Sequence, residues 1–275
     1  MSETQIQPSA LARKPGGLPL WLSRLRSYFF WDPLVWIYTI ILGTLSLLSS
    51  FFDKSGEIQH WFARFWARMI LGTIGIHVAV DGLDGTGRSF RERGPARVYV
   101  VNHLSALDIP ALYGHLPFQF RILAKRELFR YPFMGWHLSR SGQIPVDLED
   151  ARRSIRSLNR AVEAIKSGMS LVVFPEGGRS PNGELQPFMA GAFYAAVRAQ
   201  AEIVPMALVG TYETLPMNTW HIRPHPIHLL AGKPIPTQGR SVREMEQLVH
   251  EARNAIAHMY RSVKVQEHVQ QAVNE

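Results

Sequence analysis

The stretch RVYVVNHLSALD, residues 97–108, decides which fold the chain adopts. Its first half is a short run of β-branched and aromatic residues, which is typical of a buried strand. Polar residues follow, and we expect a helix to begin just after His103. A strand that passes directly into a helix is the building unit of an α/β domain.

Similar strand runs recur along the chain from residue 74 onward. They lie at 74–80, 119–124, 143–146, 170–174, 203–210 and 227–232, and helical stretches lie at 149–166, 189–201 and 241–265. This alternation predicts an α/β fold with a mostly parallel central sheet flanked by helices. In such sheets the functional site lies at the carboxyl ends of the strands, so residues there are the first candidates for chemistry.

The N-terminal part of the chain has a different pattern, which indicates contact with a membrane. Residues 33–52, PLVWIYTIILGTLSLLSSFF, carry no charge. As a helix they would extend about 30 Å, which is the thickness of the hydrocarbon layer of a bilayer. We expect a membrane anchor that either spans the bilayer or re-enters it, and a buried core helix is the alternative.

A second helix with an aromatic face follows this run. The residues on that face are Trp61, Phe62, Phe65, Trp66, Met69 and Ile70, at helical spacing. Arg64 and Arg68 flank the face and are expected to reach lipid phosphates. We therefore expect a mobile N-terminus over 1–19, a membrane-anchoring helical hairpin over 20–72 and an α/β domain over 73–275.

Composition and charge narrow the function. Of the 275 residues 46% are hydrophobic and 19% are charged, which excludes a disordered chain. The net charge of +8 suits an anionic membrane or phosphorylated molecules, and the lack of a basic tail argues against nucleic acid. The chain has no cysteine, which excludes a thiolate nucleophile and a cysteine-bound metal.

His103 and Asp108 are the candidates for acid–base catalysis. A histidine at a strand end with a carboxylate five residues later can form a base with its orienting partner. The carboxylate fixes the tautomer of the ring and stabilises the imidazolium that forms when the ring accepts a proton. The pair alone is also compatible with an ordinary helix N-terminus, and its place after a strand favours catalysis.

Two further groups of residues follow other strands and suit an anion. The motif FPEGGRS, residues 174–180, combines glycines that let a ligand approach the backbone with Arg179, whose guanidinium matches a phosphate. Lys125 stands at the end of another strand, where a compact cation can meet a phosphate. Each group alone is equally typical of a solvated loop.

Taken in chain order, these motifs resemble those of the glycerolipid acyltransferase family, most closely the 1-acyl-sn-glycerol-3-phosphate (lysophosphatidic acid) acyltransferases. The pattern comprises Asn102 and His103 with Asp108, KREL from Lys125 to Leu128 with Pro132 and Gly135, FPEGGRS from Phe174 to Ser180, Val204 with Pro205, and GKPI from Gly232 to Ile235. The resemblance covers residues 74–235. The family's membrane-binding N-terminal helices match residues 20–72.

The resemblance implies roles for individual residues. His103 and Asp108 match the catalytic dyad of the family, and Lys125 and Arg179 match positions associated with the phosphate of the acceptor. The implied substrate-binding set is Lys125, Glu176, Gly177, Gly178, Arg179 and Ser180. Gly178 stands where the family usually has Thr, which puts the identity of the acceptor in question.

The implied reaction moves a fatty acyl group from acyl-CoA or acyl carrier protein to the sn-2 hydroxyl of lysophosphatidic acid, giving phosphatidic acid in phospholipid biosynthesis. The acceptor hydroxyl is then the nucleophile, so the enzyme needs a base and forms no acyl-enzyme. The chain also lacks a G-x-S-x-G elbow. The alternatives are the same transfer to another lysolipid, such as a lyso-ornithine lipid or a lysophospholipid, and a non-catalytic peripheral membrane-binding protein.

The expected partners are the lipid bilayer, lysophosphatidic acid and the acyl donor, without nucleic acid. No cofactor beyond the acyl-CoA or acyl-ACP co-substrate is expected. His221, His225 and His228 suggest a metal, but the prolines among them indicate a loop, and we expect no metal site. We expect the catalytic domain on the cytoplasmic face of a membrane, the inner membrane of a bacterium.

Overall fold

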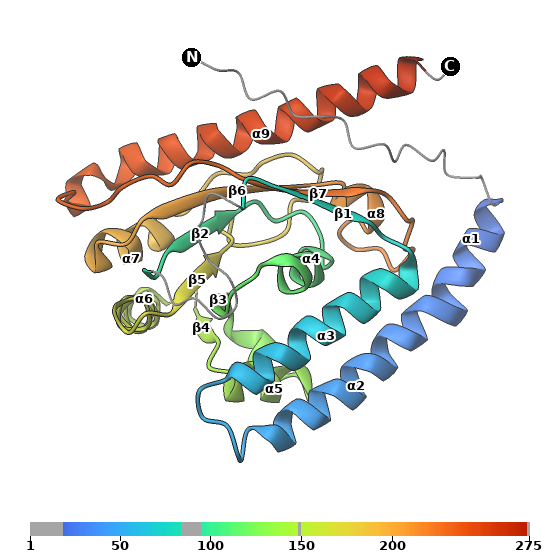
Figure 1. Ribbon diagram of the computed structural model, residues 1–275, viewed down its shortest axis with the longest axis horizontal. Coiled ribbons are helices and arrows are strands. Elements are labelled where there is room, and N and C mark those ends of the chain that lie inside the picture. Colours follow the sequence, from blue (N-terminus) through green and yellow to red (C-terminus); the bar gives the residue numbers. More distant parts are fainter. Residues whose placement is uncertain (1–18, 84–94, 148–149, 274–275) are drawn as a thin grey trace.

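The computed structural model describes residues 19–83, 95–147 and 150–273. Its centre is a seven-stranded sheet with the order β1-β7-β6-β2-β5-β3-β4 (Figure 1). The strands are β1 (Val78–Asp81), β2 (Val98–Val101), β3 (Phe120–Lys125), β4 (Ile144–Val146), β5 (Ser170–Val173), β6 (Ile203–Val209) and β7 (Ile227–Ala231). Every neighbouring pair is parallel except β6 and β7. The predicted mostly parallel sheet is confirmed.

The strand runs in the sequence match these strands, with one shift. β1 begins at Val78 and not at residue 74, because the preceding helix continues through Ile74. Gly75 ends that helix with a φ of 75°, a conformation that glycine adopts without strain. The central strands β2, β5 and β6 are buried along their whole length, as expected where helices cover both faces of a sheet.

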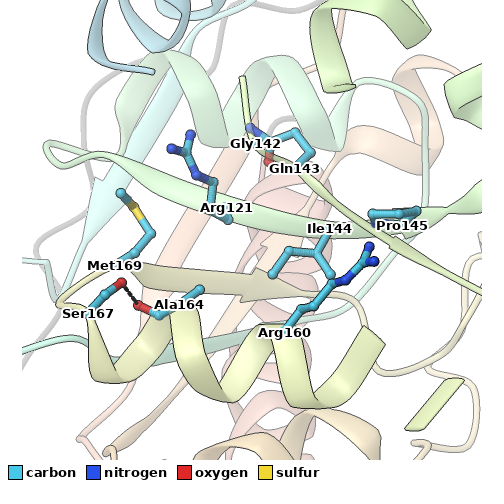
Figure 2. A pocket seen from close by; sticks show the side chains of 9 residues that line it. All are labelled: Arg121, Gly142, Gln143, Ile144, Pro145, Arg160, Ala164, Ser167 and Met169. Carbon is cyan, nitrogen blue, oxygen red and sulfur yellow. Dashed lines mark hydrogen bonds between the residues drawn. The ribbon is translucent and has the colours of Figure 1, made fainter. Parts of the chain in front are cut away.

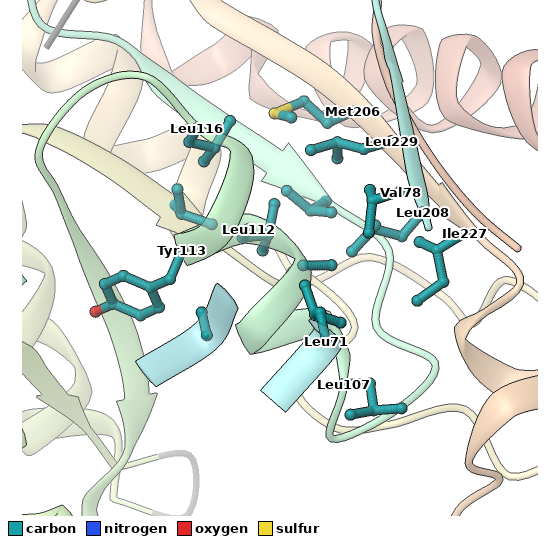
Figure 3. Close-up of a cluster of buried hydrophobic side chains, with 14 of the residues drawn as sticks. Leu71, Val78, Leu107, Leu112, Tyr113, Leu116, Met206, Leu208, Ile227 and Leu229 are labelled. Carbon is teal, nitrogen blue, oxygen red and sulfur yellow. The ribbon is translucent and has the colours of Figure 1, made fainter. Parts of the chain in front are cut away.

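Helices form a layer on each face of the sheet. One layer contains α3 (Glu57–Ile74) and α4 (Asp108–His115), and the other contains α6 (Ala151–Lys166), α7 (Gly191–Ala199) and α9 (Met245–Val273). Figure 3 shows the core under the first layer, where Leu71 of α3 and Leu112 of α4 meet Leu208 of β6. The short elements η3 (Arg126–Arg130), α5 (Met134–Arg140) and α8 (Thr211–Thr214) have no counterpart among the predicted helices.

The N-terminal segment forms the predicted helical hairpin. α1 (Leu20–Arg26), the π-helical η1 (Ser27–Trp31) and α2 (Asp32–Ser49) join into one helix, and α3 returns beside it (Figure 1). Residues 20–49 are long and apolar enough to cross a membrane, and little of their most apolar window is buried. Tyr38 and Trp66 hydrogen-bond to Thr73 and Thr39, respectively, and so join α2 to α3.

Arg64 and Arg68, which are expected to reach lipid phosphates, also have partners within the protein. Arg64 donates to the Leu116 carbonyl at 2.6 Å, and Arg68 donates to the Gly114 carbonyl at 3.2 Å. Both carbonyls lie at the C-terminal end of α4, where backbone oxygens lack helical partners and carry partial negative charge. These arginines therefore fasten α3 to α4. Arg68 is nevertheless exposed, so its contact with lipid stays a prediction.

The buried side of α3 belongs to the core of the α/β domain, to which it contributes Ala63, Ala67, Ile70, Leu71 and Ile74. The aromatic face predicted on this helix is consequently divided: Trp61 and Phe65 are exposed, whereas Ile70 packs inside. The expected domain boundary at residue 73 is therefore not a break in packing. The expected mobile N-terminus lies outside the described residues except for Pro19.

Candidate active site

The loop after β2 brings His103 and Asp108 together. β2 ends at Val101 and α4 begins only at Asp108, later than predicted, so the intervening residues curl around the carboxylate. His103 Nδ1 lies 2.7 Å from Asp108 Oδ2. The backbone N–H groups of Leu104 and Ser105 donate to the same oxygen at 2.7 and 2.9 Å. The predicted contact between the two side chains is thus present.

This geometry leaves the outer nitrogen of the ring free to act as a base. Asp108 is fully buried and, as a carboxylate, only accepts hydrogen bonds, so His103 Nδ1 carries the proton of the neutral ring. Nε2 is then the basic nitrogen, on a side chain that is 18% exposed. The ring also stacks on Phe174, with centroids 4.1 Å apart, which fixes its plane.

Glu176 holds the backbone of the histidine. Its Oε1 accepts the His103 N–H at 2.9 Å, and its Oε2 accepts the Gln186 N–H at 3.1 Å. Burial raises the pKa of Glu176 to about 7, although both hydrogen bonds act in the opposite direction. Both oxygens thus accept a backbone amide, which positions His103; the contact with the acceptor that the resemblance implies stays a prediction.

Lys125 lies beside the FPEGGRS loop. β5 lies between β2 and β3 in the sheet, so the loop after β5 has the ends of both strands as neighbours. A Cβ atom at Gly178 would lie 3.9 Å from Lys125 Nζ and would meet no other neighbour within 4 Å. Lys125 and Arg179 are exposed, and neither forms an ion pair within the described part of the chain. Two available cations beside open backbone suit a phosphate.

The two glycines of this loop, Gly177 and Gly178, differ in whether their backbone conformation requires glycine. Gly177 has a φ of 71°, which disfavours any side chain. Gly178 has no such restriction, and the space beside it is open apart from the Lys125 ammonium group. The turn therefore does not require glycine at position 178. The absence of a side chain there leaves open space around the two cations.

Ser105 and Ser180 are fully buried and bind their own loops. The Ser105 hydroxyl donates to the Leu215 carbonyl at 2.8 Å. The Ser180 N–H donates to the His103 carbonyl at 2.8 Å, and its hydroxyl donates to Asn182 at 3.0 Å. Ser180, which the resemblance places in the substrate-binding set, thus supports the loop from inside.

Asn102 has a role that the sequence did not reveal. Its buried side chain accepts the Leu208 N–H at 2.7 Å and donates to the Leu208 carbonyl at 2.8 Å. The side-chain amide therefore takes the place of a backbone partner for Leu208. It fastens the end of β2 to β6 at the point where the backbone pairing between these two strands ends. A polar residue that directly follows a fully apolar strand was the available signal.

A cavity of about 310 Å³ lies away from this site, at the amino ends of the strands. It is lined by Arg121, Gly142, Gln143, Ile144, Pro145, Arg160, Ala164, Ser167 and Met169 (Figure 2). These residues surround the starts of β3, β4 and β5. The guanidinium of Arg121 donates to the carbonyls of Ser55 and Ser141, so it braces two loops there.

The histidines that suggested a metal have other contacts. His221 Nε2 lies 3.0 Å from the Ser23 hydroxyl, and Arg223 donates to His221 Nδ1 at 3.3 Å. In the described part of the chain, no three histidine, aspartate or glutamate side chains are grouped so as to hold a metal ion. His221 instead joins α1 to the loop before β7.

Comparison with known proteins places this arrangement in a family. Residues 83–209, which contain the dyad, Lys125 and the FPEGGRS loop, match the family model described as Acyltransferase. A chloroplastic 1-acyl-sn-glycerol-3-phosphate acyltransferase of Arabidopsis thaliana is 33% identical over 86% of this chain, which spans 64% of that relative's length. An uncharacterized acyltransferase of Schizosaccharomyces pombe is 31% identical over 73% of this chain and 76% of its own length.

A solved structure has the same fold. The crystal structure of the 1-acyl-sn-glycerophosphate acyltransferase of Thermotoga maritima superposes with a TM-score of 0.73 at 23% sequence identity, covering 88% of this chain and 97% of the other. The long N-terminal helix and the helix-covered sheet are therefore shared over nearly the whole chain. On the strength of the family model and of relatives above 30% identity, the chain belongs to the acyltransferase family.

Proposed function

We propose that the protein transfers a fatty acyl group from an acyl thioester to the sn-2 hydroxyl of lysophosphatidic acid and so makes phosphatidic acid. The observation that carries the proposal is the His103–Asp108 pair, whose Nδ1 is held by a buried carboxylate while Nε2 has no partner in the described part of the chain. The names of the Arabidopsis relative and of a Helicobacter pylori relative, 35% identical over 46% of this chain, support this acceptor. A purely membrane-binding protein would have no use for such a pair.

In the proposed step, His103 acts as a general base. Nε2 takes the proton of the acceptor hydroxyl as its oxygen attacks the thioester carbonyl, and the buried Asp108 carboxylate stabilises the imidazolium. The C–O bond forms, the C–S bond breaks, and the imidazolium returns the proton to the departing thiolate. The products are the ester and a free thiol, and the step requires only side chains of this chain.

Direct transfer is favoured over an acyl-enzyme. The chain has no cysteine, and the serines of the two loops around the dyad, Ser105 and Ser180, are fully buried. Their hydroxyls already donate to Leu215 and Asn182, so attack on a thioester would first require both loops to open. An acceptor hydroxyl bound beside Nε2 needs no such rearrangement.

Lys125 and Arg179 are proposed to bind the acceptor phosphate. They are exposed and come from the ends of neighbouring strands, and Arg179 adds a planar fork of donors. The open space at Gly178 favours a second candidate acceptor, a lysolipid with a larger head group, such as a lysophospholipid or a lyso-ornithine lipid. Both acceptors use the same base and the same donor.

The outer face of the N-terminal helix is proposed to lie in the membrane. On α2 the exposed apolar residues are Trp36, Ile37, Ile40, Ile41, Leu45 and Leu48, a spacing that forms one side of a helix. The opposite side of α2 packs against α3 and α5. A helix with protein along one flank suits burial within one leaflet, and we place the catalytic domain on the cytoplasmic face, where acyl thioesters are made.

Thiol release by purified protein tests the proposal. Donors are acyl-CoA and acyl carrier protein, and acceptors are lysophosphatidic acid, lysophosphatidylglycerol and a lyso-ornithine lipid. We expect release with lysophosphatidic acid that His103→Ala abolishes, while His258→Ala, an exposed histidine on α9, leaves it intact. Release with another lysolipid alone would establish the second acceptor, and no release with any pair would refute the acyltransferase proposal.

A further inference from the structure

Residues 126–140, RELFRYPFMGWHLSR, form a surface that neither the proposed chemistry nor the N-terminal anchor explains. The segment begins directly after Lys125 and consists of η3, a short connection and α5. Its exposed large apolar side chains are Leu128, Tyr131, Met134 and Trp136, of which Tyr131 is 56% and Trp136 47% exposed. So many exposed apolar groups on a short segment indicate a surface that binds something.

The segment is held against the end of α2. The Ser46 hydroxyl lies 2.7 Å from His137 Nδ1, and Phe133 packs beside Gly43. The Arg140 guanidinium lies over the ring of Phe51, 5.3 Å from its centroid. These contacts join α5 to the helix whose outer face is proposed to lie in the membrane, and so hold residues 126–140 beside that helix.

The charge of the segment also favours a lipid surface. It carries Arg126, Arg130 and Arg140 against the single acid Glu127. Each arginine near an anionic leaflet contributes about 1 kcal/mol to membrane binding. Tryptophan and tyrosine favour the interface between hydrocarbon and water. Arg130 is exposed and has no ion pair within the described residues, so its charge is available to lipid phosphates.

We propose that residues 126–140 are a second membrane-contact site, which binds an anionic phospholipid surface beside α2. The site begins one residue after Lys125, the proposed ligand of the acceptor phosphate. A lysolipid that leaves the bilayer here therefore meets the acceptor cations without crossing water. The inference rests on the proposed membrane contact of α2, but not on the acyl-transfer chemistry.

Labelling of single cysteines tests this site, and the chain has no cysteine of its own to interfere. Trp136→Cys, Ile41→Cys on α2 and Ile155→Cys on α6 each replace an exposed apolar residue. Each variant of the full chain carries an environment-sensitive fluorophore and is mixed with vesicles of phosphatidylglycerol and phosphatidylcholine in equal parts, with or without a nitroxide-labelled lipid. We expect the labels at 136 and 41 to shift to the blue and to be quenched by nitroxide, and the label at 155 to do neither.

Two outcomes would overturn the inference, and they are distinguishable. If the label at 41 enters lipid while the label at 136 behaves like that at 155, the membrane face ends at α2. If neither 41 nor 136 enters lipid, the proposed anchor fails as well. A response of the 136 label to acyl carrier protein but not to vesicles would make the surface a protein-docking site and would also refute the inference.

Vesicle binding by charge variants gives an independent readout. Arg130→Gln should weaken binding to the anionic vesicles about fivefold and should not change binding to pure phosphatidylcholine. Arg156→Gln, an exposed arginine on α6, is the matched control and should change neither. Equal effects of the two substitutions would show a non-specific charge effect and would count against a local site.

Discussion

Replacement of Asp108 by asparagine separates the two tasks of this carboxylate. Asp108 Oδ2 accepts hydrogen bonds from His103 Nδ1, Leu104 N–H and Ser105 N–H, whereas Oδ1 is buried without a partner among the described residues. The two backbone donors require an oxygen at the Oδ2 position. Asparagine should therefore turn its amide oxygen toward the ring and its NH₂ group into the Oδ1 position, which preserves the tautomer of His103.

The expected loss of activity then comes from the missing charge. A full charge beside the imidazolium, about 4 Å from its centre, contributes about 4 kcal/mol at an effective dielectric constant of about 20. That energy corresponds to a fall in kcat of about 10³-fold. Enzymes in which the asparagine also imposes the wrong tautomer lose about 10⁴-fold, so Asp108→Asn should fall short of that limit.

The stability of the variant should change much less than its activity. The hydrogen bonds to Asp108 become neutral and weaker, and the new NH₂ group is buried without a partner, but the cost of burying a charge disappears. We expect a decrease of about 1–3 kcal/mol in the free energy of unfolding, which leaves an ordinary domain folded.

Rates of thiol release and denaturant unfolding of the same preparation check both numbers. Asp150→Asn, which alters the cap of α6, is the matched control and should keep its kcat. A fall of less than tenfold for folded Asp108→Asn would show that the charge does not assist the base. A variant that is inactive because it is unfolded would refute the stability argument.

Three further predictions concern the residues around the dyad. Arg179→Ala should raise the acceptor KM about ten- to a hundredfold with little effect on the donor KM, and Arg179→Lys should restore only part, as steady-state kinetics can show. The folded pKa of Glu176, about 7, exceeds its ordinary value of 4.5, so its stabilising contribution is present below pH 4.5 and is lost as the pH rises through 7. The free energy of unfolding of the wild type relative to Glu176→Gln should therefore fall over that range, and a flat difference in urea titrations would contradict the pKa. Asn102→Ala leaves both backbone groups of Leu208 unpaired and buried, and should cost about 2–4 kcal/mol in the same titrations.

The sheet was predictable from the sequence because its strands are buried on both faces and therefore consist of apolar runs. β2, β5 and β6 are examples, with no exposed residue in any of them. The contact between His103 and Asp108 was predictable because the two residues lie in one short loop. Such features depend on residues that are close in sequence, so local sequence patterns are enough to predict them.

Features that depend on distant parts of the chain were not predictable. Arg64 and Arg68 have the spacing of lipid-facing arginines, and the sequence does not reveal that both also bind carbonyls at the end of α4, about 50 residues later. For both arginines the partner carbonyl is set by tertiary packing.

The structure separates the residues that hold His103, the proposed base, from those that are proposed to select the acceptor. His103 is held at its N–H by Glu176, at its carbonyl by the Ser180 N–H and at Nδ1 by Asp108. A base fixed at three points needs little reorganisation when the proton moves, which is how positioned groups lower a barrier. Gly178 takes part in none of these contacts. A change at that position can therefore alter the space beside Lys125 while His103 stays in place, so we expect the departure at Gly178 to affect the choice of acceptor and not the proposed chemistry.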